Sequence, residues 1–220
     1  MVPISRALDL DLNVAGKPVL RWTLSALSAV ACLGEIVVAS EGMLSGRHIP
    51  PPSLPCVPVR VLTLEPGTAR LAAIQAALAA ASPAPRALIH DADRPLTTPA
   101  GIEALLRAGD GLPAAVAAVP ARNTLKRVVD GEVVETVPRD RLYQPQTPAV
   151  FDRALLQDAL RRAREEAWSC IHELQLATMA GIPTRLVPGD PLNVPISAPA
   201  SVPFAELTLA GSRIPAGGTR

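Results

Sequence analysis

Short apolar runs alternate with helical patterns along most of the chain. The runs are rich in Val, Ile and Ala, which is typical of strands, and the first of them suits a strand buried on both faces of a sheet. They are EIVVA (35–39), VRVLTL (59–64), RALIH (86–90), AAVAAVP (from 114) and TRLVP (184–188). Apolar residues recur at helical spacing over 18–30, 69–81, 100–108, 151–167 and 172–181. This alternation predicts an α/β fold with βαβ units, a mostly parallel sheet and helices on both faces, with ligands beyond the carboxyl ends of the strands.

A different pattern begins at Leu125. Two β-rich runs, LKRVV and EVVETV, flank the pair Asp130-Gly131, which is a strong hairpin signal. We therefore expect a protruding β-arm over about residues 125–145. The proline-rich loop at 47–58 is expected to cross the surface outside the sheet, and an irregular tail is expected after 188.

Composition narrows the class of protein. The chain has 220 residues, 49% of them hydrophobic, which excludes general disorder and predicts one domain over residues 1–220. Its net charge of +1 and few aromatic residues argue against a nucleic-acid reader, and no apolar run is long enough to cross a membrane. Three cysteines without a C-x-x-C pair, and a start without signal-peptide features, predict a cytoplasmic location.

The turn IHDADRP follows directly after a buried strand. It brings His90, Asp91, Asp93 and Arg94 to the edge where an α/β sheet binds its ligands. Carboxylates there suit Mg²⁺, which often shares its ligands with substrate phosphates. Alternatively, an aspartate of this turn caps the next helix and Arg94 pairs with a carboxylate.

Two further segments carry candidate anion-binding side chains. In NTLKR (123–127), Thr124 could donate a hydrogen bond to a phosphate and Lys126 or Arg127 could balance its charge, unless the segment is only a solvated strand end. The segment VPRDRLYQPQTP (137–148) is unusually polar for a return segment. It could bind a ligand, decorate the arm or contact a second subunit, and its candidates are Arg139, Arg141, Gln144 and Gln146.

The remaining candidates carry weaker signals. In EPGTAR (65–70), Gly67 and Arg70 lie where a helix begins, so backbone N–H groups could meet an anion, although simple capping explains the pattern as well. Zinc is not expected, because the histidines and cysteines have no ligand spacing. Cys32 and Cys170 lie in apolar patterns that favour inert, buried thiols.

Several motifs, in order along the chain, resemble the 2-C-methyl-D-erythritol 4-phosphate cytidylyltransferase family. The most specific are IHDADRP against V-H-D-A-A-R-P, NTLKR against D-T-[LM]-K-R, and QTP followed by Phe151. The resemblance implies a Rossmann-like nucleotidyltransferase fold with a β-arm that helps to form a homodimer. It also implies transfer of CMP from CTP to a sugar-alcohol phosphate with Mg²⁺, which releases pyrophosphate in non-mevalonate isoprenoid biosynthesis.

The same resemblance assigns roles to individual positions. Asp91 matches the aspartate near the metal, Arg94 the arginine that supports that turn, and Lys126 a basic residue at the base of the arm; these are the catalytic candidates. Thr124 and Arg139 match positions that hold the methylerythritol phosphate. The nucleotide-binding candidates are Arg6, Gly67 and Arg70.

The chain also departs from the family pattern on the nucleotide side. The family's glycine-rich phosphate loop is replaced by VPISRALDLDLNVAGKP, which has no glycine before Gly16 and retains only Arg6. The other departures are Ala73 for a serine, Pro195 for a lysine, Asn123 for an aspartate, and Ile171-His172-Glu173 for T-D-[ED]. Because phosphoryl transfer depends on neutralising phosphate charge, these departures predict weak or impaired CTP-dependent activity, or alternatively a non-catalytic paralogue that acts as a binding or dimerisation module.

Overall fold

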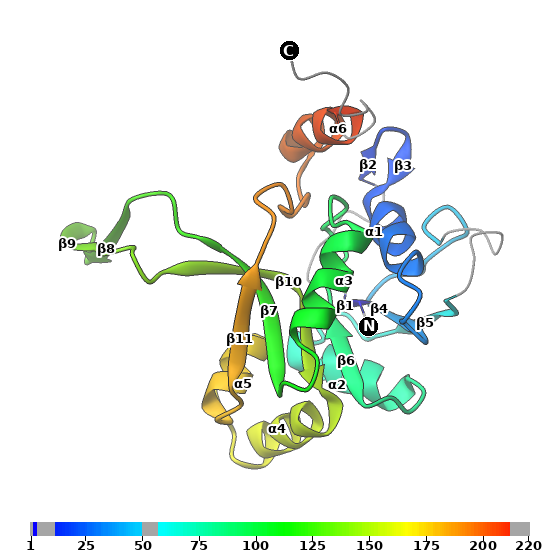
Figure 1. Cartoon of the computed structure of the whole chain (residues 1–220), viewed down its shortest axis with the longest axis horizontal. Helices are drawn as coiled ribbons and strands as arrows, with labels where there is room; N and C mark the ends of the chain where they lie inside the picture. Colours follow the sequence, from blue (N-terminus) through cyan, green and yellow to red (C-terminus); the bar gives the residue numbers. More distant parts are fainter. Residues whose placement is uncertain (1, 4–11, 50–56, 212–220) are drawn as a thin grey trace.

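The predicted strands lie in two main sheets (Figure 1). The computed structural model describes residues 2–3, 12–49 and 57–211, with the backbone alone at 2–3. The first sheet has the order β1 (Val2–Pro3), β4 (Ile36–Ser40), β5 (Val59–Thr63), and both of its pairings are parallel. The second has the order β11 (Thr184–Pro188), β7 (Ala114–Pro120), β10 (Tyr143–Asp152), β6 (Arg86–Ile89).

Strand β10 makes the second sheet mixed. It runs antiparallel to both β6 and β7, whereas β7 and β11 are parallel to each other. The sequence pattern did not indicate β10, because prolines lack the N–H that a ladder needs. The register accordingly shifts between Pro145 and Ala149, around the cis Thr147-Pro148 bond. The run PAVF beyond this shift supplies buried residues to the centre of the sheet.

Helices cover both faces of the second sheet, as predicted. On one face, Ile89 and Phe151 pack with α2 (Arg70–Ala80), α4 (Arg153–Glu165) and α5 (Glu173–Met179). On the other, Leu88 and Val150 pack with α1 (Val19–Ser28) and α3 (Pro99–Ala108). Neighbouring residues of one strand point to opposite faces, so β6 and β10 each contribute to both cores. A continuous apolar run was therefore the correct signal for β6.

The predicted hairpin forms the arm, which consists of β8 (Leu125–Val129) and β9 (Glu132–Val137). The two strands are antiparallel, and Asp130 and Gly131 have φ angles of 49° and 85°, as the tight turn of such a hairpin requires. The arm extends away from the sheets (Figure 1). Its large apolar side chains are exposed, namely Leu125, Val128, Val129, Val133 and Val134. An isolated two-stranded ribbon with apolar side chains in water is typical of a docking element.

The expectation of an irregular tail is wrong for part of the C-terminal segment. A short 3₁₀ helix, η1 (Pro199–Ser201), leads into α6 (Val202–Gly211). The helix packs on a small hairpin of β2 (Asn13–Val14) and β3 (Lys17–Pro18), where the Ala15 amide donates to Glu206 Oε1 at 2.9 Å. Proline is favoured in the first turn of a helix, so Pro199 could have indicated that a helical segment begins here. Of the proline-rich loop, residues 50–56 lie outside the described residues.

Gly189, which follows β11, is a position where any side chain would collide with its surroundings. A Cβ there would overlap the side-chain oxygen of Gln146 and lie 3.1 Å from the backbone of Ala118. We expect Gly189→Ala to lower the free energy of unfolding by about 1–3 kcal/mol in urea denaturation. Gly34→Ala is the control, because a Cβ there meets nothing within 4 Å; equal stability of the two variants would contradict this packing.

Candidate active site

The turn after β6 places Asp91 between two arginine side chains. Arg70 Nη1 lies 2.8 Å from Asp91 Oδ1, and Arg94 Nε lies 3.1 Å from Oδ2. The Asp91 side chain is 16% exposed, so each ion pair is partly shielded from water. The alternative in which an aspartate caps the next helix is wrong, because Thr98 caps α3 by accepting from the Gly101 amide. The pairing of Arg94 with a carboxylate, part of that same alternative, is present.

Both arginines are themselves anchored from other elements. Arg70, at the start of α2, donates from Nε and Nη2 to the two carboxylate oxygens of Glu173, at 2.7 and 2.8 Å. Glu173 begins α5, and its side chain is fully buried. Arg94 Nη1 donates to the Asn193 carbonyl oxygen at 2.7 Å. Segments from four parts of the chain therefore converge on one carboxylate.

The QTP segment of β10 supports the same turn from the neighbouring strand. The Asp91 amide donates to Thr147 Oγ1 at 2.9 Å, and Asn193 Nδ2 donates to the Thr147 carbonyl at 2.9 Å. Gln146 is buried and donates to the Asp190 carbonyl at 2.8 Å. Of the candidate ligand-binding side chains in this segment, Gln146 thus stabilises the fold, while Gln144 and Arg141 are exposed.

The environment of this turn shifts the pKa values of two neighbouring carboxyl groups in opposite directions. Burial by itself would raise the pKa of Asp91, but the positive charges of Arg70 and Arg94 outweigh it and the pKa lies below its ordinary value. For Asp93, burial and then the negative charge of Asp91 raise the pKa to about 6. For Arg70, Glu173 and Asp91 raise the pKa against the opposing effect of burial, so this guanidinium stays charged.

The donor set of this turn fits Mg²⁺ held mainly by substrate phosphates. Such an ion takes only one or two protein carboxylates and completes its shell with phosphate and water oxygens. Asp91 is ionised, and Asp93 has no ion-pair partner among the described residues. A bound cation would offset the mutual repulsion that raises the pKa of Asp93. Within the described ranges, no group of three or more His, Cys, Asp or Glu side chains could hold a metal without such help.

The other predicted site residues lie on or near the arm. Thr124 is exposed beside the start of β8, and Lys126 Nζ donates to Thr136 Oγ1 across the hairpin at 2.6 Å. Arg127 pairs with Glu135 on the opposite strand of the arm. Arg139 donates from Nη1 to the Arg122 carbonyl, which brings its side chain to the segment that precedes Thr124. Within the described part of one chain, these residues make no hydrogen bond or ion pair with the Asp91 turn and form a second, separate cluster.

The nucleotide-binding candidates are only partly described. Gly67 has a φ of 82° in the turn before α2, a conformation that favours glycine, and Arg70 is the first residue of that helix. Thr68 Oγ1 donates to the Glu65 carbonyl and tightens the turn. Arg6 lies outside the described residues.

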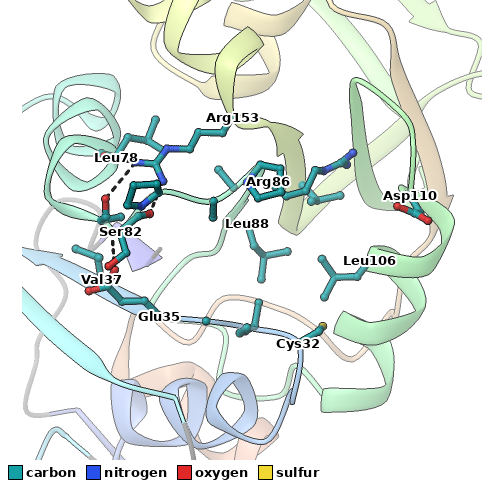
Figure 2. A pocket seen from close by; sticks show the side chains of 18 residues that line it. Cys32, Glu35, Val37, Leu78, Ser82, Arg86, Leu88, Leu106, Asp110 and Arg153 are labelled. Atoms are coloured by element: carbon teal, nitrogen blue, oxygen red, sulfur yellow. Dashed lines mark hydrogen bonds between the residues drawn. The ribbon is translucent and has the colours of Figure 1, made fainter.

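A cavity of about 470 Å³ lies away from this site, at the amino ends of β4 and β6 (Figure 2). Arg153 closes one side by donating to the Leu78 and Ser82 carbonyls, and Glu35 accepts from the Ser82 amide at 2.7 Å.

Cys32 lies at the rim of this cavity and is exposed, so the prediction of a buried Cys32 is wrong. It follows the C-terminal end of α1, where the helical pattern no longer determines burial. Cys170 is half-buried.

Three supporting residues were not found from the sequence. Glu173 lies in a segment that was noted only as a departure from a family motif, and Asn193 lies beside the equally deviant Pro195. Thr23, in α1, donates to the Ala92 carbonyl at 2.8 Å and holds the turn from the opposite face. Each is distant in sequence from Asp91, so local pattern carried no signal of the contact.

Solved structures share this architecture. A crystal structure of 2-C-methyl-D-erythritol 4-phosphate cytidylyltransferase from Thermus thermophilus superposes with a TM-score of 0.76 and 31% identity, covering 96% of this chain and 98% of the other. A 4-diphosphocytidyl-2C-methyl-D-erythritol synthase structure from Anaerococcus prevotii shares the fold with a TM-score of 0.79 at 22% identity, covering 95% of this chain and 94% of the other. The fold and the arginine-held acidic turn together define a Rossmann-like nucleotidyltransferase domain.

Sequence comparison identifies the particular family. The family model for IspD, 2-C-methyl-D-erythritol 4-phosphate cytidylyltransferase, matches residues 9–211. The enzyme of that name from Symbiobacterium thermophilum is 34% identical over 200 residues, which span 90% of this chain and 83% of the relative. The one from Azoarcus sp. is 36% identical over 211 residues, with 90% and 84% covered. This chain belongs to the 2-C-methyl-D-erythritol 4-phosphate cytidylyltransferase family. No helix within the described residues is long and apolar enough to span a membrane.

His90 makes the stability of this region dependent on pH. It is fully buried, neither ring nitrogen has a hydrogen-bond partner among the described residues, and burial lowers its pKa from 6.5 to about 3. The unfolded chain therefore binds a proton between these values that the folded chain does not, so this contribution to stability is complete above pH 6.5 and is lost as the pH falls towards 3.

We expect the wild-type protein to lose up to about 1.4 kcal/mol of stability per pH unit through His90 in this window. Urea unfolding of wild type and His90→Leu at a series of pH values isolates the effect, because other acid-sensitive groups are common to both proteins. The difference in stability should grow in favour of the variant as the pH falls. Parallel stability curves would show that His90 has the same pKa in the folded and unfolded states, and would contradict this expectation.

Proposed function

We propose that this protein transfers CMP from CTP to 2-C-methyl-D-erythritol 4-phosphate. The observation that carries the proposal is the Asp91 carboxylate held between Arg70 and Arg94, in a chain that belongs to this family. In the reaction, a phosphate oxygen of the acceptor attacks the α-phosphorus of CTP and forms a new phosphoanhydride bond. The bond between the α-phosphorus and the bridging oxygen to the β-phosphorus breaks, and pyrophosphate leaves.

The residues of the Asp91 turn prepare the charge pattern that this reaction needs. Arg70 and Arg94 keep Asp91 ionised and fix both of its oxygens. Asp91 and Asp93 would hold Mg²⁺, which when bound neutralises phosphate charge that develops on the leaving group. Positioning and electrostatic stabilisation supply most of the catalysis in phosphoryl transfer, so a rigid carboxylate is useful even where it touches no reacting atom.

The acceptor phosphate is proposed to bind at the base of the arm. Thr124 offers a hydroxyl and Arg139 a guanidinium, and a charge-assisted hydrogen bond from arginine is among the stronger contacts that a phosphate can receive. Arg139 uses one Nη1 donor on the Arg122 carbonyl, which orients the side chain and leaves its other N–H groups for a ligand. Lys126, exposed nearby, adds positive charge to the same edge.

The arm is proposed to form a homodimer. Its exposed valines would be covered by a second copy, as members of this family are expected to pair. Such a pairing would also bring Thr124 and Arg139 of one copy towards the Asp91 turn of another. This would account for the separation of the two clusters within a single chain.

The affinity of the protein for CTP is proposed to be low. The chain has no glycine between residues 1 and 15 that could let backbone N–H groups wrap a triphosphate, and Ala73 and Pro195 replace a hydroxyl and an ammonium group of the family pattern. The Gly67 turn and Arg70, at the start of α2, remain as candidate nucleotide-binding groups among the described residues. We therefore expect a KM for CTP in the millimolar range.

The test is pyrophosphate release from CTP in the presence of 2-C-methyl-D-erythritol 4-phosphate and Mg²⁺. We expect wild-type turnover at millimolar CTP and at least a ~100-fold loss of kcat in Asp91→Asn, since the change removes a fixed charge at the reacting phosphates. Asp110→Asn is the matched control, because Asp110 is exposed and lies far from the turn at the cavity rim.

A second variant separates acceptor binding from chemistry. Arg139→Ala should raise the KM for the acceptor about 10-fold or more while the KM for CTP stays close to wild type. If wild type releases no pyrophosphate but still binds methylerythritol phosphate through Arg139, the non-catalytic binding module is the correct function and the transferase proposal is wrong.

Dimerisation through the arm is tested by light scattering after size-exclusion chromatography. We expect wild type to be a dimer at micromolar concentrations, and Val133→Lys to be a monomer because it places charge on the most exposed valine of the arm. Val61→Lys, on β5, is a control at a half-exposed valine outside the arm. A wild-type monomer, or a dimer that tolerates Val133→Lys, would contradict this arrangement.

A further inference from the structure

Glu173 is a charged side chain that the proposed reaction does not itself use. It is fully buried, and both carboxylate oxygens accept from Arg70, at 2.7 Å from Nε and 2.8 Å from Nη2. The third contact of Arg70, from Nη1, is the 2.8 Å bond to Asp91. We propose that Glu173 is a positioning residue: it fixes Arg70 and offsets its charge so that Asp91 can still hold a divalent cation. This inference rests on the proposed function.

The first part of the argument is geometric. A planar guanidinium and a carboxylate joined by two hydrogen bonds fix each other's orientation, so Arg70 can present only the Nη1 edge to Asp91. Without Glu173, the same guanidinium could turn two N–H groups onto Asp91 and occupy both lone pairs that face it. Arg94 already contacts the other oxygen, at 3.1 Å. Glu173 thus limits Asp91 to one hydrogen bond from each arginine and leaves acceptor capacity on the carboxylate.

The second part is electrostatic. The two arginines and the two carboxylates of this cluster balance in charge, and all four side chains are at most 16% exposed. Removing the charge of Glu173 makes this cluster more positive by one unit beside Asp91, an excess that low exposure leaves poorly screened. That excess repels a cation directly. Glu173 also faces the His172 ring, with Nδ1 at 3.6 Å, but this ring is half-exposed and caps α5.

A purely structural role for Glu173 is the competing explanation. An acidic residue in the first turn of a helix is stabilised by the helix dipole, and Glu173 is the first residue of α5. However, the helix already has a cap in His172, whose Nδ1 accepts from the Leu174 amide at 3.3 Å. A structural role would affect thermal stability alone. A positioning role would also change the affinity of the site for a cation.

The experiment measures Mn²⁺ binding by electron paramagnetic resonance in the presence of CTP, without acceptor, together with Mg²⁺-dependent turnover. We expect Glu173→Gln to weaken Mn²⁺ binding about 10-fold or more, the size typical of residues that orient a metal ligand. We expect kcat to fall by a similar factor at wild-type Mg²⁺ concentrations and to recover in part at high Mg²⁺, while the KM for the acceptor stays within about twofold.

Two further variants keep the result interpretable. Glu173→Asp retains the charge but moves the carboxylate, so it should bind Mn²⁺ better than Glu173→Gln and also covers the case in which the glutamine variant does not fold. Glu165→Gln removes an exposed glutamate of α4 and should match wild type in every assay.

The outcomes separate this inference from the proposed function. Wild-type Mn²⁺ affinity in both Glu173 variants, with only a lower melting temperature, would overturn the positioning role. A wild-type protein that binds no Mn²⁺ with CTP would overturn it as well. If wild type binds Mn²⁺ and CTP but transfers no CMP, the proposed function fails, and a loss of Mn²⁺ affinity in Glu173→Gln would still support the role of Glu173.

Discussion

The ion-paired carboxylate of Asp91 is the contact on which the site depends. A buried charge is costly unless it is paired and hydrogen-bonded, and here the guanidiniums of Arg70 and Arg94 meet that requirement. One arginine comes from the start of α2 and the other from the turn itself, and they are held in turn by the start of α5 and by the segment after β11. The ion pairs therefore fix the relative positions of elements that the apolar cores only bring close together. Breaking one of them would leave an unpaired charge in a low-dielectric environment.

The alternation of strands and helices could be predicted from sequence because the elements are locally determined. Strands β4, β6 and β7 are short runs of mostly apolar residues, and the helices between them repeat with a helical period. The hairpin turn at Asp130-Gly131 was likewise predictable, since few residues accept its positive φ angles. Strand β10 and helix α6 were not, because β10 is interrupted by prolines and α6 owes its place to packing against a distant hairpin.

The residues of the site likewise fall into those that could be predicted from the sequence and those that could not. Asp91 and Arg94 lie in one short motif, so both their presence and their pairing could be anticipated. The hydrogen bond between Arg70 and Glu173 joins residues 103 positions apart, and the sequence around either residue does not predict the contact. The resemblance to a family motif indicated that the turn IHDADRP belongs to the active site. Only the three-dimensional arrangement showed that a segment which departs from the family motif still contributes a buried carboxylate to it.

Strand β10 connects the two clusters of functional residues along the chain. One end, at Tyr143, pairs with Pro120 close to where the arm begins, and the other end, at Asp152, caps α4. Between these ends, Thr147 accepts the hydrogen bond of the Asp91 amide. The base of the arm and the residue that supports the carboxylate-bearing turn thus lie on one continuous stretch of backbone. The irregular pairing between Pro145 and Ala149 lies on the same stretch, where β10 passes from the arm to the centre of the sheet.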